Sequence, residues 1–328
     1  MPESESGLRI DVRSVAHGIW RIDTFERGRR GRAAAYAIDG GTEIALVETG
    51  TNAGLPSLIA GLRAAGLAED RVRSVWVTHV HLDHAGALGA LAARWPSARV
   101  FVHPKGARHV TDPSRLEESA RAVYGETFDA YFGHLLPVPE NQVHAPADGE
   151  RIRIGDREFV ALYTPGHAPH HMMIEDLETR GIFTGDGAGI LYVNLWPWGI
   201  GAFHLPTTSP PRFDPDLMVQ SLARVRALDP DRLYFTHFGL GEPAEPYLVQ
   251  CMEDARAWGR LAQASRSQEE VRERLRSWIE DRLRERGVHD LAAAWEAADL
   301  DMDLDLDSQG LWVYASRGAV HPFGPSGG

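Results

Sequence analysis

A dense group of metal-ligand side chains at a strand-to-helix turn constrains this chain more than any other feature. Residues 79–84 read His-Val-His-Leu-Asp-His, so three imidazoles and one carboxylate fall within six residues. The largely apolar run 72–77 before them predicts a buried strand, and the alanine- and leucine-rich run 85–94 after them predicts a helix. Imidazole and carboxylate groups bind zinc and also suit iron or manganese. We therefore expect a metal site at this turn rather than a solvated polar loop.

Three later stretches place one more ligand side chain directly after an apolar strand. His167 follows Tyr-Thr-Pro-Gly, Asp186 follows Ile-Phe-Thr-Gly, and His237 follows Leu-Tyr-Phe-Thr. Each is weak evidence alone, because such residues are more often structural at strand ends. Together with residues 79–84 they supply five histidines and two aspartates, the ligand count for two metal ions. Four protein ligands and a shared water leave each ion partly open, which is typical of a catalytic site.

Apolar runs predict strands in two groups, each accompanied by helices. The first group covers residues 8–12, 19–22, 35–38, 44–47, 72–77 and 99–103, and the second covers 151–154, 158–163, 171–174, 181–184 and 232–236. Helices are predicted at 56–65, 85–94, 105–135, 214–228 and 245–298. Two β-rich halves with helices favour two sheets packed face to face and covered by helices on the outside.

The motifs together resemble the metallo-β-lactamase superfamily over roughly residues 8–240. The resemblance lies in the His-x-His-x-Asp-His motif, the Thr-Pro-Gly-His and Thr-Gly-Asp strand ends, and the final histidine. It implies an α+β fold, a four-layer αββα sandwich of two mixed β-sheets flanked by helices. It also implies two divalent metal ions, zinc in the first place, with iron or manganese as alternatives. One ion would be held by His79, His81 and His167, the other by Asp83, His84 and His237, with Asp186 bridging the two.

Departures from the family pattern reduce the range of functions that the resemblance suggests. Lactam-cleaving members usually carry a cysteine where this chain has Asp186, and flavodiiron reductases carry a glutamate where it has His81. Lactonase-like members place a tyrosine three residues after the bridging aspartate, where this chain has Gly189, with Tyr192 nearby. The strand before the first helix ends Glu-Thr-Gly at Glu48, where the family usually has Asp-Thr-Gly.

The resemblance and the ligand chemistry predict a metal-dependent hydrolase of a small ester, thioester or lactone. A metal-bridging hydroxide would attack the carbonyl of this small acyl substrate, and Asp83 would orient it. An iron-dependent sulfur dioxygenase and a phosphodiesterase or nuclease are the alternatives. The long loop 187–215 is rich in Gly, Pro and Trp, and such loops are often functional. Its candidates for substrate binding are Tyr192, Trp196, Trp198 and Phe203. Tyr124 and Tyr131 of the predicted helix 105–135 could complete an apolar pocket with them, and plain core packing is the competing interpretation.

Residues 1–244 are expected to form the catalytic domain. Residues 245–328 are expected to form a helical extension packed on it, ending in a short strand at 311–315. This extension either caps the active site or mediates a homodimer. The acidic run 301–307 has Leu306 where a calcium loop needs glycine, so we interpret it as a connector.

Charge and composition exclude several partners. The formal charge of −12 disfavours nucleic acid, which proteins grip through its phosphates. The single cysteine excludes an intrachain disulfide and a thiolate zinc site. The arginine-rich run 27–32 fits a solvated hairpin tip better than an anion-guiding loop. With no apolar signal segment at the N-terminus and no membrane-length run, we expect a cytoplasmic protein without a membrane partner.

Overall fold

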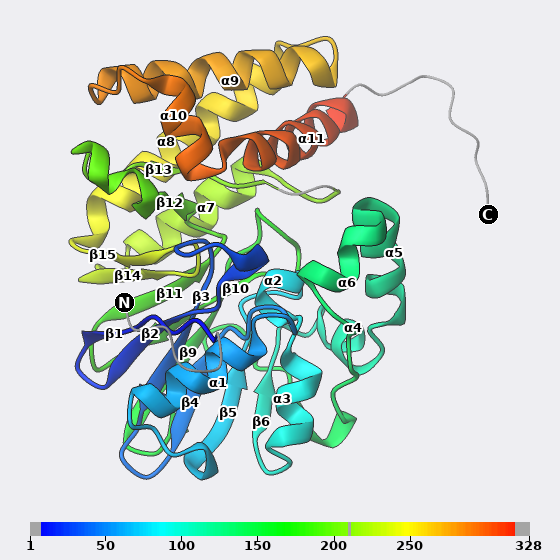
Figure 1. Ribbon diagram of the computed structural model, residues 1–328, viewed down its shortest axis with the longest axis vertical. Coiled ribbons are helices and arrows are strands. Elements are labelled where there is room, and N and C mark those ends of the chain that lie inside the picture. The colour runs from blue at the N-terminus through cyan, green and yellow to red at the C-terminus, as the bar shows by residue number, and fades with distance from the viewer. Residues whose placement is uncertain (1–7, 209–210, 319–328) are drawn as a thin grey trace.

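Two β-sheets pack against each other in the centre of the molecule, and helices cover their outer faces (Figure 1). The computed structural model describes residues 8–208 and 211–318. This arrangement confirms the predicted four-layer αββα sandwich. None of the helices within those residues is both long enough and apolar enough to cross a lipid bilayer.

The first sheet contains seven strands in chain order within the described residues. Its antiparallel half consists of β1 (Val12–Ala16), β2 (Ile19–Asp23), β3 (Ala34–Asp39) and β4 (Ile44–Val47). Its parallel half adds β5 (Val72–Trp76), β6 (Arg99–Phe101) and β7 (Val143–His144). The first strand was predicted at 8–12, and it instead begins at Val12.

The second sheet has the order β15-β14-β11-β10-β9-β8. Its strands are β8 (Arg151–Ile154), β9 (Arg157–Tyr163), β10 (Met172–Asp176), β11 (Gly181–Gly185), β14 (Arg232–Phe235) and β15 (Gly239–Gly241). Only β11 and β14 pair in parallel among these described strands, so the sheet is mixed. Within the predicted long loop, the described residues 187–208 contain a small ribbon of β12 (Ile190–Leu191) and β13 (His204–Leu205), with the 3-10 helix η5 (Val193–Trp198) between them.

Alternation along the strands explains the layers. In β4, Ala45 and Val47 belong to the cluster between the sheets, whereas Ile44 and Leu46 face the outer helices. The outer helices of the first sheet are α1 (Leu55–Ala64) and α3 (Leu88–Arg94). The second sheet is covered by α7 (Pro215–Arg226) and α8 (Ala244–Gln263).

Shorter helices connect these layers. The turn after β5 leads into α2 (Leu82–Ala85). The 3-10 helix η1 (Glu26–Gly28) joins β2 to β3, and the 3-10 helices η2 (Glu69–Arg71) and η4 (Glu140–Gln142) precede β5 and β7. The predicted helix at 105–135 is broken into α4 (Ala107–Thr111), α5 (Ser114–Tyr124), η3 (Gly125–Thr127) and α6 (Phe128–Tyr131). Pro113 lies at the first break. Gly125 lies at the second, with a positive φ of 54° that side-chain-bearing residues rarely adopt.

The end of the described chain consists of helices joined by short turns, which corrects two predictions. After α8 come α9 (Gln268–Glu285), α10 (Leu291–Ala298) and α11 (Leu300–Gly318). The predicted strand at 311–315 is wrong, and so is the acidic connector at 301–307, because both segments belong to α11. Leu300, Leu304 and Leu311 recur at helical spacing and are fully buried with α8 and α9. This packing outweighs the strand preference of the aromatic and β-branched residues 312–314.

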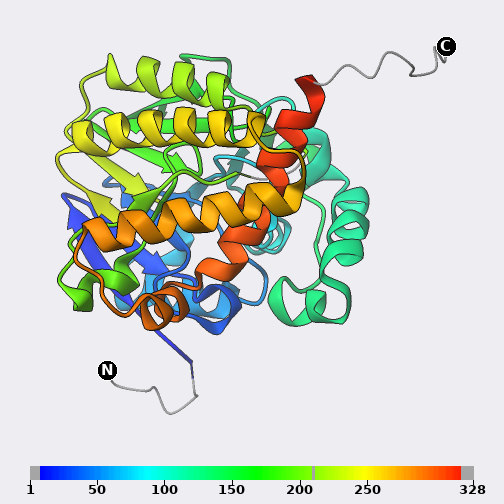
Figure 2. The same ribbon diagram turned by 90° about the horizontal axis from the view of Figure 1, so that it is seen from above.

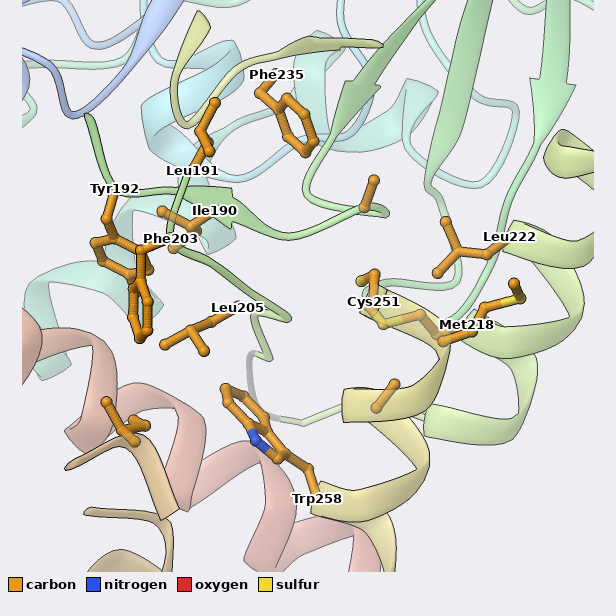
Figure 3. Close-up of a cluster of buried hydrophobic side chains, with 14 of the residues drawn as sticks. Ile190, Leu191, Tyr192, Phe203, Leu205, Met218, Leu222, Phe235, Cys251 and Trp258 are labelled. Atoms are coloured by element: carbon orange, nitrogen blue, oxygen red, sulfur yellow. The ribbon is translucent and has the colours of Figure 1, made fainter. Parts of the chain in front are cut away.

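A single hydrophobic cluster joins the second sheet, α7 and the C-terminal helices. Figure 3 shows part of it, with Trp258 and Cys251 of α8 gathered with Leu205 of β13 and Leu222 of α7. Seen from above, α9 and α11 lie across one end of the sandwich (Figure 2). The division of the chain near residue 244 stays a prediction.

Candidate metal centre

Seven side chains meet where strands of both sheets end. His79 and His81 follow β5, Asp83 and His84 lie on α2, and His167, Asp186 and His237 follow β9, β11 and β14. They form one group of His79, His81, His167 and Asp186, and a second group of Asp83, His84 and His237. Within each group the ligand atoms lie within 4.8 Å of one another. The structure therefore brings together all seven residues that the sequence singled out, and their role as ligands stays a prediction.

Glycines in the strand-end motifs allow this convergence. Gly185 has a φ of 51°, and a Cβ there would collide with the hydroxyl of Thr78, directly before His79. Gly166 has a φ of 146°, and a Cβ there would collide with the backbone of Met218 on α7. Only glycine lets these two turns pack so closely while they deliver Asp186 and His167.

Asp186 lies between the two groups. Its Oδ2 atom is 3.2 Å from Nε2 of His167, and its Oδ1 atom is 3.0 Å from Nε2 of His84. In the first group, Nδ1 of His81 lies 2.8 Å from Nε2 of His79 and 3.1 Å from Nε2 of His167. One carboxylate thus offers an oxygen to each group, which is the arrangement of a bridging ligand.

Hydrogen bonds behind the imidazoles fix which nitrogen faces the site. Nδ1 of His237 donates to the main-chain oxygen of Arg32 at 2.6 Å, and Nδ1 of His167 donates to that of Thr207 at 3.3 Å. Nδ1 of His79 donates to the hydroxyl of Thr78 at 3.0 Å. The Nε2 atoms of these three rings therefore face the site: those of His79 and His167 lie near Nδ1 of His81, and that of His237 lies 3.1 Å from the Asp83 carboxylate. Imidazole nitrogens and carboxylate oxygens that converge in this way are the donors that divalent metal ions bind, so the donor set fits such ions.

Glu48 supports this arrangement from the end of β4, directly before Thr49 and Gly50. It is fully buried, accepts a hydrogen bond from the Thr78 hydroxyl at 2.5 Å, and lies 3.2 Å from Nδ1 of His84. Its φ of 67° is unusual for a residue with a side chain and costs about 1–3 kcal/mol. Glu48 therefore supports both groups of candidate ligands, the first through Thr78 and the second through His84. The sequence motif alone left this role undecided.

Electrostatics favour positive charge at the centre. Burial and the neighbouring imidazoles hold the pKa of His79 and of His81 well below the usual range, so both rings are neutral. Burial raises the pKa of Asp83 and Asp186, but the nearby histidines outweigh it and hold both carboxyls ionised. Burial lowers the pKa of His237, but the carboxylates of Asp186 and Asp83 outweigh it and raise that pKa to about 9.

A cavity of about 300 Å³ opens in front of the ligands. Five of the seven candidate ligands reach its wall: His81, Asp83, His167, Asp186 and His237. Most of the remaining wall comes from η1, α5, the turn at Thr207 and Thr208, and α11, and single side chains complete it: Arg32, Leu82, Phe132 and Ile190. The extension therefore reaches the candidate active site.

Of the aromatic residues predicted for the substrate pocket, Tyr124 lines this cavity, whereas the four candidates on the long loop and Tyr131 do not. The Tyr192 ring is buried and its hydroxyl donates to Asp303 at 2.9 Å, and Phe203 is buried in the hydrophobic cluster. Trp196 and Trp198 on η5 are 50% and 37% exposed. Tyr192 and Phe203 are thus packed in the core, as the competing interpretation expects, and the substrate-binding role of the loop residues stays a prediction.

Sequence reasoning missed two charged residues of the cavity wall, Arg32 and Asp303. Their side chains form a bidentate ion pair at 2.7 and 3.0 Å, and each is only 6% exposed. The arginine-rich run is therefore not simply a solvated hairpin tip. Neither residue carries a motif, and the partners lie 271 positions apart. The alternation of aspartate and leucine at 301–307 was the available signal, because on a helix it places Asp303 and Asp307 on one face.

Comparison with known proteins places these features in a family. The model of the metallo-beta-lactamase superfamily matches residues 28–237. The metallo-beta-lactamase fold-containing protein ST1585 of Sulfurisphaera tokodaii is 31% identical over 188 residues, which cover 56% of this chain and 67% of that protein. The human acyl-coenzyme A thioesterase MBLAC2 is 27% identical over 190 residues, 53% of this chain and 64% of the relative. The hydroxyacylglutathione hydrolase of Cereibacter sphaeroides is 31% identical over 157 residues, 47% of this chain and 54% of the relative.

Solved structures share the fold over more of the chain. The crystal structure of ST1585 superposes with a TM-score of 0.61 at 23% identity, covering 86% of this chain and 93% of that one. The metallo-beta-lactamase family protein TTHA1429 from Thermus thermophilus gives a TM-score of 0.63 at 21% identity, covering 89% and 91%. At this identity the likeness shows the fold alone. The curated relatives above are matched over between 54% and 67% of their own length, and α11 lies beyond the family match.

Proposed function

Because this chain belongs to the metallo-β-lactamase superfamily, we propose that it is a dinuclear metal-dependent hydrolase that cleaves a small ester, thioester or lactone. The observation that carries the proposal is the position of Asp186, with one carboxylate oxygen toward each group of histidines. A single structural ion would need only one of the two groups. A site that also opens into a cavity is arranged for catalysis.

The side chains divide into three roles. His79, His81 and His167 hold one position, Asp83, His84 and His237 hold the other, and Asp186 serves both. Two divalent ions, zinc in the first place, would polarise a carbonyl and bring the pKa of a shared water toward neutrality. The side chain of Asp83 is 25% exposed and reaches the cavity wall, so it can accept a hydrogen bond from the attacking water and orient it toward the substrate.

Two further observations support an acyl substrate. Much of the cavity wall is apolar, as a small carbonyl compound requires, and the formal charge of −12 disfavours a polyanionic nucleic acid. Two relatives are named as an acyl-coenzyme A thioesterase and a hydroxyacylglutathione hydrolase. We therefore place the substrate among carbonyl compounds rather than phosphodiesters.

A substrate panel tests the proposal. Metal-free protein is reloaded with zinc and offered an aryl ester, an acyl thioester, a lactone and a bis-aryl phosphate. We expect zinc-dependent hydrolysis of at least one carbonyl compound, with kcat/KM reduced about a thousandfold or more in Asp186→Asn. Faster cleavage of the phosphodiester would contradict the proposal. Oxygen uptake with bound iron, the signature of a sulfur dioxygenase, would also contradict it.

A further inference from the structure

Helix α11 forms one wall of the cavity in front of the candidate metal ligands. Its residues Met302, Leu306 and Gln309 recur at spacings of four and three, so they lie on one face of the helix. All three are half-buried and line the cavity. Both ribbon views place α11 between the other C-terminal helices and the segment of α5 and α6 (Figures 1 and 2).

Helix α5 contributes a matching wall. Leu116, Ala120 and Tyr124 recur at spacings of four, and all three line the same cavity. Phe132 adds a buried ring that contacts Tyr124, with ring centroids 4.7 Å apart. Two helical stripes with mostly apolar side chains therefore border one cavity that ends at the metal ligands.

Two buried aspartates hold α11 in place. Asp303 pairs with Arg32 at 2.7 and 3.0 Å and accepts the hydroxyl of Tyr192. One turn later, Asp307 accepts the main-chain N–H of Thr208 at 2.6 Å, and its own main-chain oxygen accepts the Thr208 hydroxyl at 3.0 Å. Moving α11 away would break a buried ion pair, so the wall is formed before substrate binds.

Four charged side chains outside the candidate metal ligands line the cavity, and two of them, Glu26 and Arg27, lie near Tyr124. Arg32 and Asp303 are paired with each other, and the remaining charged side chains outside the metal ligands, Glu26 and Arg27, come from η1. An aliphatic chain between α5 and α11 would meet leucine, methionine and tyrosine side chains.

We propose that α11 selects the substrate, with Met302 and Leu306 binding a medium-length aliphatic chain of the carbonyl compound against Leu116 and Tyr124. This inference rests on the proposed hydrolase function and names the apolar part of its substrate. Each methylene buried there raises kcat/KM about fourfold. The cavity is small for a ligand site, so the gain ends once the chain fills it.

The first test measures selectivity in the zinc-loaded protein. p-Nitrophenyl acetate, butyrate, hexanoate and octanoate form a series that varies only the acyl chain. Alkyl acetates of matching length vary the alcohol instead, and show which side of the ester carries the chain. We expect the hexanoate-to-acetate ratio of kcat/KM to fall about tenfold in Leu306→Trp, since the indole fills the cavity. Leu228→Trp is the matched control, because Leu228 is exposed and distant from the ligands in the strand direction: it precedes the start of β14, whereas His237 follows the end of that strand.

A second variant covers the case in which the tryptophan disturbs folding. Leu306→Ala keeps a good helix former on a half-buried face and enlarges the cavity, so the octanoate-to-hexanoate ratio should rise about threefold or more. Unchanged ratios in both folded Leu306 variants, with active wild-type enzyme, would overturn the inference and leave the proposed function intact.

The third readout needs no turnover. In metal-free, methyl-labelled protein, octanamide should shift the Met302 methyl resonance, assigned with Met302→Leu, and leave that of Met252 on α8 unchanged. A shift without hydrolysis of any ester, thioester or lactone supports the aliphatic site and overturns the proposed function. No shift at Met302 overturns the aliphatic site.

Discussion

His237 donates a hydrogen bond through Nδ1 to the main-chain oxygen of Arg32, whose own guanidinium is paired with Asp303. The orientation of a candidate metal ligand therefore depends on a residue of α11. His167 is placed in a similar way, because it donates to Thr207, and Asp307 binds the adjacent Thr208. One turn of the C-terminal extension supports ligands on both sides of the centre.

Removing one partner of the Arg32–Asp303 ion pair should destabilise the protein more than replacing both partners. Asp303→Leu leaves Arg32 buried without a counter-charge, and we expect it to lower the free energy of unfolding by about 3–5 kcal/mol. The double variant Arg32→Met/Asp303→Leu should recover most of that loss, because neither partner of the pair is then left buried without the other. Urea unfolding of wild type and both variants measures this. A double variant no more stable than the single one would contradict the account of a buried, paired charge.

Glu48 is expected to strengthen metal binding without being a ligand. Glu48→Gln keeps the size of the side chain but weakens its contacts with Thr78 and His84, so we predict zinc affinity about 10–100-fold lower. Competition with a chromophoric chelator gives the affinity. Glu69→Gln, at a surface pair with Arg94, is the control and should bind zinc as wild type does. Equal zinc affinities of the Glu48→Gln and Glu69→Gln variants would contradict a supporting role of Glu48 in metal binding.

Zinc should stabilise the folded chain. A ligand that binds only the native state adds about 2.7 kcal/mol at one hundred times its dissociation constant, so Tm should rise with free zinc. Differential scanning calorimetry of metal-free protein across a zinc series measures the rise, with magnesium as the control ion. Asp186→Asn should lose most of this dependence. A Tm of the wild-type protein that does not change with zinc concentration would contradict a preformed zinc site.

Phe203 separates the two interpretations of the long loop. As a buried member of the hydrophobic cluster, Phe203→Ala should lower the free energy of unfolding by about 3–5 kcal/mol. If Phe203 instead binds substrate, as predicted from the sequence, Phe203→Ala should raise KM and leave the free energy of unfolding near that of the wild type. Chemical unfolding and KM on the same preparation distinguish them, and the second pattern would contradict the packing seen here.

The metal centre was predictable because its signals are local. Each ligand motif joins a strand to a turn, and strand ends of a sandwich gather at one edge, so the sequence alone predicts that His79, Asp186 and His237 lie together. The support from α11 was not predictable. In the sequence, a buried aspartate such as Asp303 cannot be distinguished from a solvated one. Only the fold brings Asp303 to Arg32. Likewise Trp312 and Tyr314 suggested a strand until packing of α11 on α8 and α9 made that segment helical.

The most direct test of the central claim is the number of zinc ions bound per chain, measured by native mass spectrometry on metal-free protein titrated with zinc. We predict two ions for the wild type. Asp186→Asn should bind one or none at the same free zinc, because it weakens the oxygen donor shared by both positions. A wild-type chain that binds no zinc, or an Asp186→Asn chain that still binds two ions with unchanged affinity, would contradict the account.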